Sequence, residues 1–115
     1  MIANSTATRK AKARRLQNLV VEKIRATLGL SEIEVQSRGM GQSGCDIILS
    51  EAARAKLPFA IEAKSSDKIE IWKALEQCKV NAKKEGLKPM LVFKRERSEV
   101  WAVLMLDDLL ELMKA

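Results

Sequence analysis

The chain has 115 residues, of which 47% are hydrophobic and 31% charged, a balance typical of one globular domain. It contains no histidine, which excludes nucleophiles that depend on a histidine base, and its two cysteines fall short of the about four ligands of a structural zinc site. The formal net charge is +6 at pH 7, which suits an anionic partner. Any catalysis therefore has to use carboxylates, lysine, hydroxyls or a bound metal.

The first half of the chain predicts a long helix followed by three strands. Residues 1–8 are small and polar, so we expect a flexible segment there and a single domain over residues 9–115. Apolar residues spaced four apart predict a helix over residues 9–28, which Gly29 would end. The three strands are predicted at residues 32–38, 45–50 and 59–64.

The second half predicts another helix, two strands and a short C-terminal helix. Gly86 would end the helix, Trp101 is expected in the core, and residues 51–56, before the third strand, favour either a short helix or a hairpin. The predicted bounds are 69–85 for the helix, 88–94 and 99–105 for the strands, and 107–114 for the last helix. The order αβββαββα predicts an α/β fold with one mixed central sheet flanked by helices.

Basic residues are concentrated in two places. Residues 1–25 carry seven Lys or Arg residues against the single acid Glu22, so their net charge (seven minus one) is +6, and a smaller basic cluster follows the fourth predicted strand. Such clusters are typical of nucleic-acid-binding proteins, although a solvated basic surface has the same composition. Aromatic residues make up only 3%, which favours contact with the backbone of duplex DNA over stacking on single strands. The residues expected to contact DNA, besides a loop serine discussed below, are Arg9, Lys10, Lys12, Arg14, Arg15, Arg38, Lys94, Arg95 and Arg97.

Asp46, Glu62 and Lys64 form the pattern from which we predict a catalytic site. Side chains two apart on a strand project from the same face, so Glu62 and Lys64 project together while Ala63 points away. If the second and third strands pair, Asp46 lies beside Glu62, and two carboxylates at one sheet edge suit Mg²⁺. The backbone carbonyl of Ala63 is a candidate third ligand, and Lys64 would orient or deprotonate the attacking water and stabilise charge on the phosphate. The alternative is a solvated edge strand, with Asp46 beginning a turn.

Residues 39–44, GMGQSG, match the glycine spacing of dinucleotide-binding loops. That motif has to open a helix, whereas this segment leads into a predicted strand, so dinucleotide binding is disfavoured. We prefer a loop in which the backbone and Ser43 approach a DNA phosphate; turn glycines without a binding role are the alternative.

Two segments carry a resemblance to a known family: SRGMGQSGCDIILSEAARAKLPFAIEAK (residues 37–64) and IEIWKALEQCKVNA (residues 69–82). They resemble phage-encoded PD-(D/E)xK nucleases related to Holliday junction resolvases, over about residues 14–110. The resemblance implies a restriction-endonuclease-like αβββαβ core in which Asp46 and Glu62 bind Mg²⁺ or Mn²⁺ and Lys64 assists the water. It also implies a homodimer that cuts four-way DNA junctions, and a phage or prophage origin.

The chain departs from this family on its first helix. Related resolvases often carry a glutamate there that belongs to the site, but Glu22 lies opposite the apolar stripe. Gln17 lies within the apolar face, so we favour Gln17 as the residue that faces the site and binds a ligand or a metal-bound water; a tolerated half-buried glutamine is the alternative. Gln77 on the second helix resembles a glutamine that reaches the site in several PD-(D/E)xK groups, with a solvated helix residue as the alternative.

The leading hypothesis is therefore a metal-dependent endonuclease acting on branched DNA. The alternatives are a restriction-like or nicking endonuclease on duplex DNA, and a non-catalytic DNA-binding module of the same fold. The N-terminus lacks the apolar core of a secretory signal, and no apolar run reaches the roughly 18 residues of a membrane span. We expect an intracellular protein without a membrane partner, in the host cytoplasm if it is phage-encoded, with Cys45 and Cys78 as buried thiols.

Overall fold

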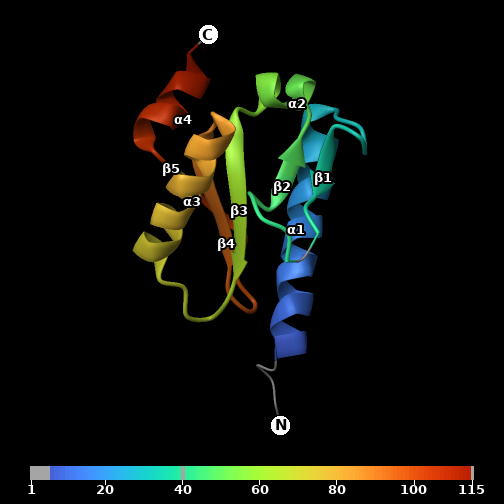
Figure 1. Ribbon diagram of the computed structural model, residues 1–115, viewed down its shortest axis with the longest axis vertical. Coiled ribbons are helices and arrows are strands. Elements are labelled where there is room, and N and C mark those ends of the chain that lie inside the picture. The colour runs from blue at the N-terminus through green and yellow to red at the C-terminus, as the bar shows by residue number, and fades with distance from the viewer. Residues whose placement is uncertain (1–5, 40, 115) are drawn as a thin grey trace.

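The computed structural model describes residues 6–39 and 41–114, which form four helices and five strands. The helices are α1 (Thr6–Leu28), α2 (Glu51–Lys56), α3 (Ile71–Glu85) and α4 (Leu106–Met113). The strands are β1 (Val35–Ser37), β2 (Ile47–Leu49), β3 (Phe59–Ser65), β4 (Lys88–Lys94) and β5 (Trp101–Leu104). This arrangement is the mixed α/β class that the sequence predicts (Figure 1).

The strands form two hydrogen-bonded sheets rather than the single mixed sheet that we predicted. Strands β1 and β2 pair antiparallel, while β3, β4 and β5 form a mixed sheet in which β3 is parallel to β4 and β4 antiparallel to β5. The side chain of Ser50 caps α2 by accepting a hydrogen bond from the Ala53 amide (3.1 Å), so β2 ends after three residues. Next to β2, the backbone amide of Asp46 donates to the carbonyl of Ile61 in β3, but no ladder continues from this bond.

Helix α1 is 23 residues long and begins at Thr6, so residues 6–8 are helical and not flexible as predicted. The remaining part of that predicted segment, residues 1–5, lies outside the described residues. Gly29 ends the helix with a φ of +66°, a left-handed conformation that favours glycine. Helix α3 begins at Ile71, two residues later than predicted, and ends at Gly86 with the same φ.

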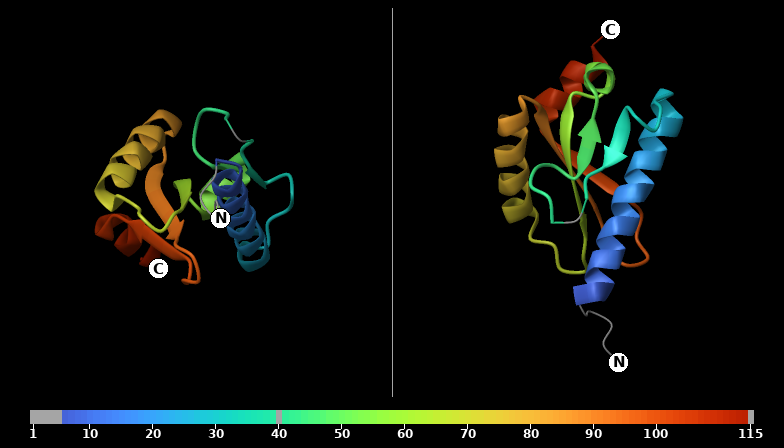
Figure 2. Two further views of the ribbon diagram at one scale, coloured as in Figure 1. Left: turned by 90° about the horizontal axis from the view of Figure 1, so that it is seen from below. Right: turned by 45° about the vertical axis from the view of Figure 1, so that its right-hand side comes forward.

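The three-stranded sheet lies between helices on both faces (Figure 2). Helix α1 packs against β1 and β3, and α3 packs against β3 and β4 from the other side. Phe59 and Ile61 belong to the core beneath α1, together with residues from β1 and β2. Ala60 belongs to a smaller cluster with Cys45 and Ala82 on the α3 side. Alternation along β3 thus places the apolar Phe59, Ile61 and Ala63 on one face and Glu62 on the other.

Two predictions about the edges of the sheets were wrong. Strand β1 begins at Val35, because Ser31 and Glu34 exchange hydrogen bonds in a turn: the Ser31 amide donates to Glu34 Oε1 (2.9 Å) and the Glu34 amide to Ser31 Oγ (3.3 Å). Trp101, expected in the core, is 57% exposed. The reason is topological, since β5 is an edge strand and Trp101, its first residue, pairs with Phe93 near the end of β4.

Both cysteines are free and buried, which confirms the prediction of buried thiols. Burial raises the pKa of the Cys78 thiol to about 11 and also raises the pKa of Cys45. Within residues 6–39 and 41–114, no helix combines the length and the apolar character needed to cross a lipid bilayer.

Candidate functional site

Asp46 joins the two sheets. Its backbone amide donates a hydrogen bond to the carbonyl of Ile61 (3.1 Å), and its Oδ2 accepts one from the amide of Ala63 (2.7 Å). The carboxylate thus takes the place of a ladder bond between β2 and β3, which form no continuous pairing. Asp46 is thereby held at the edge of β3 next to Glu62, as the spacing of the sequence motif predicts.

Glu62 is a buried acid, only 7% exposed, on the face of β3 covered by α3. Its Oε1 accepts a short hydrogen bond from Nδ2 of Asn81 on α3. Burial raises the pKa of Glu62 from its usual 4.5 to about 7, and the neighbouring Asp46 carboxylate also raises it, while Asn81 and Lys64 oppose the rise. Two carboxylates at such short range repel each other when both are ionised, and a divalent cation would relieve that repulsion.

Lys64 and the Ala63 carbonyl lie beside this pair. Lys64 is exposed, and its positive charge lowers the pKa of Glu62. Alternation along β3 places the two residues on the same face of the strand. The amide of Ala63 points to the β2 edge of β3, where it meets Asp46. Because the N–H and C=O of a strand residue point to the same edge, the Ala63 carbonyl faces that edge too.

The donor set at this edge fits an oxygen-loving divalent ion. Asp46 and Glu62 would provide carboxylate oxygens and Ala63 its carbonyl, the ligand type that Mg²⁺ and Mn²⁺ prefer. Among the described residues, no group of three or more acidic, cysteine or histidine side chains could hold a metal. An ion at this pair would therefore keep several waters or substrate oxygens, which is the usual condition of Mg²⁺ in proteins.

Gln17 and Glu22 occupy different surfaces of α1. Glu22 is exposed, whereas Gln17 is only 5% exposed and lies on the buried side of the helix beside Leu16 and Val20. No residue in the described part of the chain forms a hydrogen bond with the Gln17 side chain. Its amide atoms keep contact with solvent, since no buried side-chain nitrogen or oxygen of the described residues lacks a partner. Helix α1 packs on the face of β3 that carries Phe59 and Ile61, whereas Glu62 lies on the face covered by α3, so a role of Gln17 at the site stays a prediction.

The residue of α3 that reaches Glu62 is Asn81, which the sequence analysis missed. Gln77, the residue predicted for this role, is exposed. Its Nε2 lies 3.5 Å from Asn81 Oδ1, and it is Asn81 that donates to Glu62. Asn81 lies three residues after the buried Cys78 and directly before the buried Ala82. A polar residue at the border of an apolar stripe was the signal that could have identified it.

The loop before Asp46 is held by its own hydrogen bonds. The amide of Gln42 donates to the carbonyl of Gly39 (3.2 Å), and the Gly39 amide donates to the Gln42 side chain (3.2 Å). Arg38 Nε donates to the carbonyl of Cys45 (2.6 Å). The side chain of Arg38, which we predicted to contact DNA, therefore holds this loop with one of its nitrogen atoms. Ser43 is exposed, and residue 40 lies outside the described residues.

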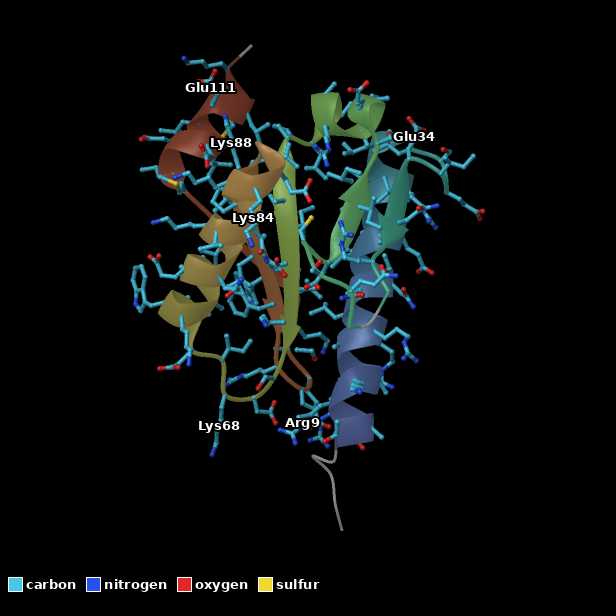
Figure 3. The ribbon with its side chains drawn as sticks, in the orientation of Figure 1. Arg9, Glu34, Lys68, Lys84, Lys88 and Glu111 are labelled. Atoms are coloured by element: carbon cyan, nitrogen blue, oxygen red, sulfur yellow. The ribbon has the colours of Figure 1, made fainter. Side chains whose placement is uncertain are left out.

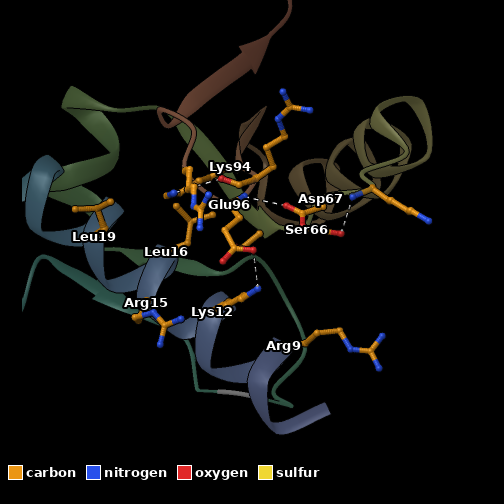
Figure 4. A pocket seen from close by; sticks show the side chains of 13 residues that line it. Arg9, Lys12, Arg15, Leu16, Leu19, Ser66, Asp67, Lys94 and Glu96 are labelled. Atoms are coloured by element: carbon orange, nitrogen blue, oxygen red, sulfur yellow. Dashed lines mark hydrogen bonds and ion pairs between the residues drawn. The ribbon is translucent and has the colours of Figure 1, made fainter. Parts of the chain in front are cut away.

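The structure divides the predicted DNA-contact residues into two groups. A groove of about 680 Å³ lies between the N-terminal half of α1, the β3–α3 loop and the β4–β5 turn (Figure 4). Asp46, Glu62 and Lys64 do not line it. Lys10 and Arg14 also lie outside it. The predicted contact residues that do line it are Arg9, Lys12, Arg15, Lys94, Arg95 and Arg97.

Comparison with known proteins gives no match: neither a family model, nor a curated protein, nor a solved structure is similar to this chain. The function of this chain is therefore inferred from the chemistry of its described residues.

Proposed function

We propose that the chain is a metal-dependent nuclease of the PD-(D/E)xK type that hydrolyses phosphodiester bonds in DNA, with the four-way junction as its preferred substrate. The observation that carries the proposal is the meeting of Asp46 and Glu62 at one edge of β3, with Lys64 beside them. The order of α1, β1, β2, β3, α3 and β4 supports a restriction-endonuclease-like core, into which the short α2 is inserted.

Each residue of the site has a distinct task in the proposed hydrolysis. Asp46 and Glu62 would hold Mg²⁺ or Mn²⁺, together with the Ala63 carbonyl. When bound, the ion supplies Lewis-acid stabilisation of charge on the phosphate and favours ionisation of the attacking water. Lys64 orients that water and stabilises the negative charge that develops on the phosphate oxygens. Water attacks phosphorus and releases one proton to solvent, the bond to the leaving oxygen breaks, and that oxygen takes up a proton from solvent. The products are a phosphate end and a hydroxyl end.

The test is incubation of the full chain with Mg²⁺ and a synthetic four-way junction. We expect paired nicks in opposing strands, and we expect Asp46→Asn to reduce the rate at least about 100-fold while junction binding in EDTA is retained. Asp107→Asn removes the same charge from exposed α4 and serves as the matched control. Equal cleavage by wild type and Asp46→Asn refutes the assignment of the site.

The same assay separates the alternatives by substrate and outcome. Equal cutting of linear duplex and junction identifies a restriction-like or nicking endonuclease with the same site. Tight binding without cleavage, in either Mg²⁺ or Mn²⁺, identifies a non-catalytic DNA-binding module. Metal binding is followed independently of activity by the increase in thermal stability on addition of Mg²⁺, which Asp46→Asn should abolish.

Resolution of a junction requires two cuts, and the described residues hold one carboxylate pair per chain, so we propose that two copies act together. A stripe of exposed apolar residues on α4 supports this: Leu106 is 68% exposed, Leu110 51% and Met113 73%. Residues with this spacing share one helix face, and a two-fold pairing buries the same stripe from both copies. Analytical ultracentrifugation should detect a dimer for wild type and a monomer for Leu110→Glu; a wild-type monomer refutes the pairing.

A further inference from the structure

The groove described above is strongly basic (Figure 4). The two carboxylates that line it are those of Asp67 and Glu96. The basic side chains outnumber them by five, seven against two, and are those of Arg9, Lys12, Arg15, Lys68, Lys94, Arg95 and Arg97. Arg9 and Lys68 lie at the same end of the molecule although they are far apart in the sequence (Figure 3). Tertiary structure thus assembles one cationic surface from three separate segments.

Hydrogen bonds join two of the three segments, the β3–α3 loop and the β4–β5 turn, while α1 is held by its packing against β3. The amide of Ser66 in the β3–α3 loop donates to the carbonyl of Lys94 at the end of β4 (3.1 Å). The Glu96 amide in the β4–β5 turn donates to Asp67 Oδ1 (2.9 Å). Within that turn, Arg97 has a φ of +64°, a conformation that L-residues rarely adopt. The groove is therefore a preformed feature rather than a chance meeting of flexible side chains.

One acid lies across the groove. Glu96 reaches from the β4–β5 turn to Lys12 on α1, with Oε2 3.8 Å from Nζ. The Lys12 side chain is 25% exposed and that of Glu96 59%, and an ion pair so open to water is weak and easily exchanged for another anion. In the described part of the chain, no acid pairs with Arg9, Arg15, Lys68, Arg95 or Arg97.

We propose that this groove binds the phosphodiester backbone of a nucleic acid, and that Glu96 occupies one phosphate position in the free protein. A bound strand would take the place of Glu96 on Lys12, and the remaining cations would contact the neighbouring phosphates. The proposal rests on the proposed function, because it adds a second contact with the same substrate. Ser65 in the groove lies three residues after Glu62, about 10 Å along β3, or roughly three base-pair steps.

The lining favours a nucleic acid over an anionic membrane surface. Proteins that bind membranes through basic residues usually insert exposed apolar side chains as well. The large apolar residues that line this groove are Leu16, which is 3% exposed, and the half-buried Leu19. Neither is free to insert into a bilayer, whereas contacts with a polyphosphate backbone need only the cations.

Two double variants of α1 test the groove directly. Arg9→Ala/Arg15→Ala removes two charges that line the groove, and Lys10→Ala/Arg14→Ala removes two exposed charges next to them that do not. Binding to a fluorescent duplex, to the corresponding single strand and to anionic lipid vesicles is measured in EDTA over about 50 to 200 mM salt. We expect the groove variant to lose about tenfold affinity per lost contact for nucleic acid, with a salt slope shallower by about 1.8 on duplex or about 1.4 on the single strand.

The control variant should change affinity and slope much less. Equal weakening by both double variants overturns the groove as the binding site, and so does a groove-dependent affinity for vesicles that exceeds that for nucleic acid. The duplex and single-strand arms show which form of backbone the groove holds. Circular dichroism spectra identical to wild type ensure that the exposed substitutions leave the fold intact.

A second pair of variants tests the role of Glu96. Glu96→Gln and Glu99→Gln each remove one negative charge from the same region, but Glu99 does not line the groove. We expect Glu96→Gln to tighten binding several-fold more than Glu99→Gln, and equal tightening overturns the competition at Lys12. Binding is measured without metal, so it is independent of cleavage. If the groove variant binds nucleic acid more weakly but the wild type does not cleave DNA, only the proposed nuclease activity is contradicted. Cleavage that survives with unchanged binding in the groove variant contradicts the groove alone.

Discussion

The raised pKa of Glu62 makes the stability of the metal-free protein depend on pH in a definite direction. The folded protein holds a proton on Glu62 that the unfolded chain releases at its usual pKa of 4.5, because burial and the Asp46 carboxylate raise the folded pKa to about 7. Between these values the unfolded chain binds fewer protons than the folded one, so the free energy of unfolding falls as pH rises. The full difference between the two pKa values corresponds to about 3 kcal/mol of folding stability. The protein loses this contribution as pH rises to about 7, and its stability then no longer depends on Glu62 titration at higher pH.

Substitution of Glu62 by glutamine isolates this contribution. The variant keeps the side-chain shape and an oxygen that can accept from Asn81. Urea unfolding of wild type and Glu62→Gln is measured in EDTA at several values between about pH 4 and about pH 8, since the titration of groups that do not interact with Glu62 cancels in the difference. We expect the wild type to lose about 3 kcal/mol relative to the variant over this range.

Parallel stability curves for the two proteins would refute the reasoning, because they would show that Glu62 is ionised in the folded state like any surface acid. A decline in the opposite direction would also refute it. Addition of Mg²⁺ on the alkaline side should restore part of the lost stability in wild type and none in Glu62→Gln. The affinity for Mg²⁺ should fall as pH decreases below about 7, because protons compete for the Glu62 carboxylate.

Three further predictions concern the surroundings of the site and the core. Asn81→Ala removes the hydrogen bond to Glu62 and should weaken Mg²⁺ affinity by about 10- to 100-fold in titration calorimetry, whereas Gln77→Ala, which removes a residue behind Asn81, should have a much smaller effect. Gln17→Leu should lower junction cleavage if the Gln17 amide binds a ligand or a metal-bound water at the site, and unchanged cleavage would show that Gln17 does not serve the site. Phe59→Ala should lower the free energy of unfolding by about 3–5 kcal/mol, since Phe59 is fully buried beneath α1, and a loss below 1 kcal/mol in urea titration would contradict this core.

Local patterns were enough to predict most elements of this fold. The apolar stripe of α1, the glycines that end α1 and α3, and the apolar run of β4 depend on interactions within a few residues, so their positions could be predicted from the chain alone. The same holds for the relation between Glu62 and Lys64, which alternation along one strand places on one face. Strand ends and edge positions were predicted less well, because they depend on neighbours that a local pattern does not contain.

Only tertiary structure could show how β2 meets β3 and which residues surround that point. The Asp46 carboxylate replaces a ladder bond with the Ala63 amide, and Asn81 rather than Gln77 reaches Glu62, because the rotation of α3 is set by its packing on the sheet. The basic residues in the first half of α1 all carry one positive charge and are close neighbours in the sequence, so the sequence does not distinguish those that line the groove from those that do not. Whether each of them lines the groove depends on the helix face that packs against the rest of the molecule, and that is a property of the folded chain.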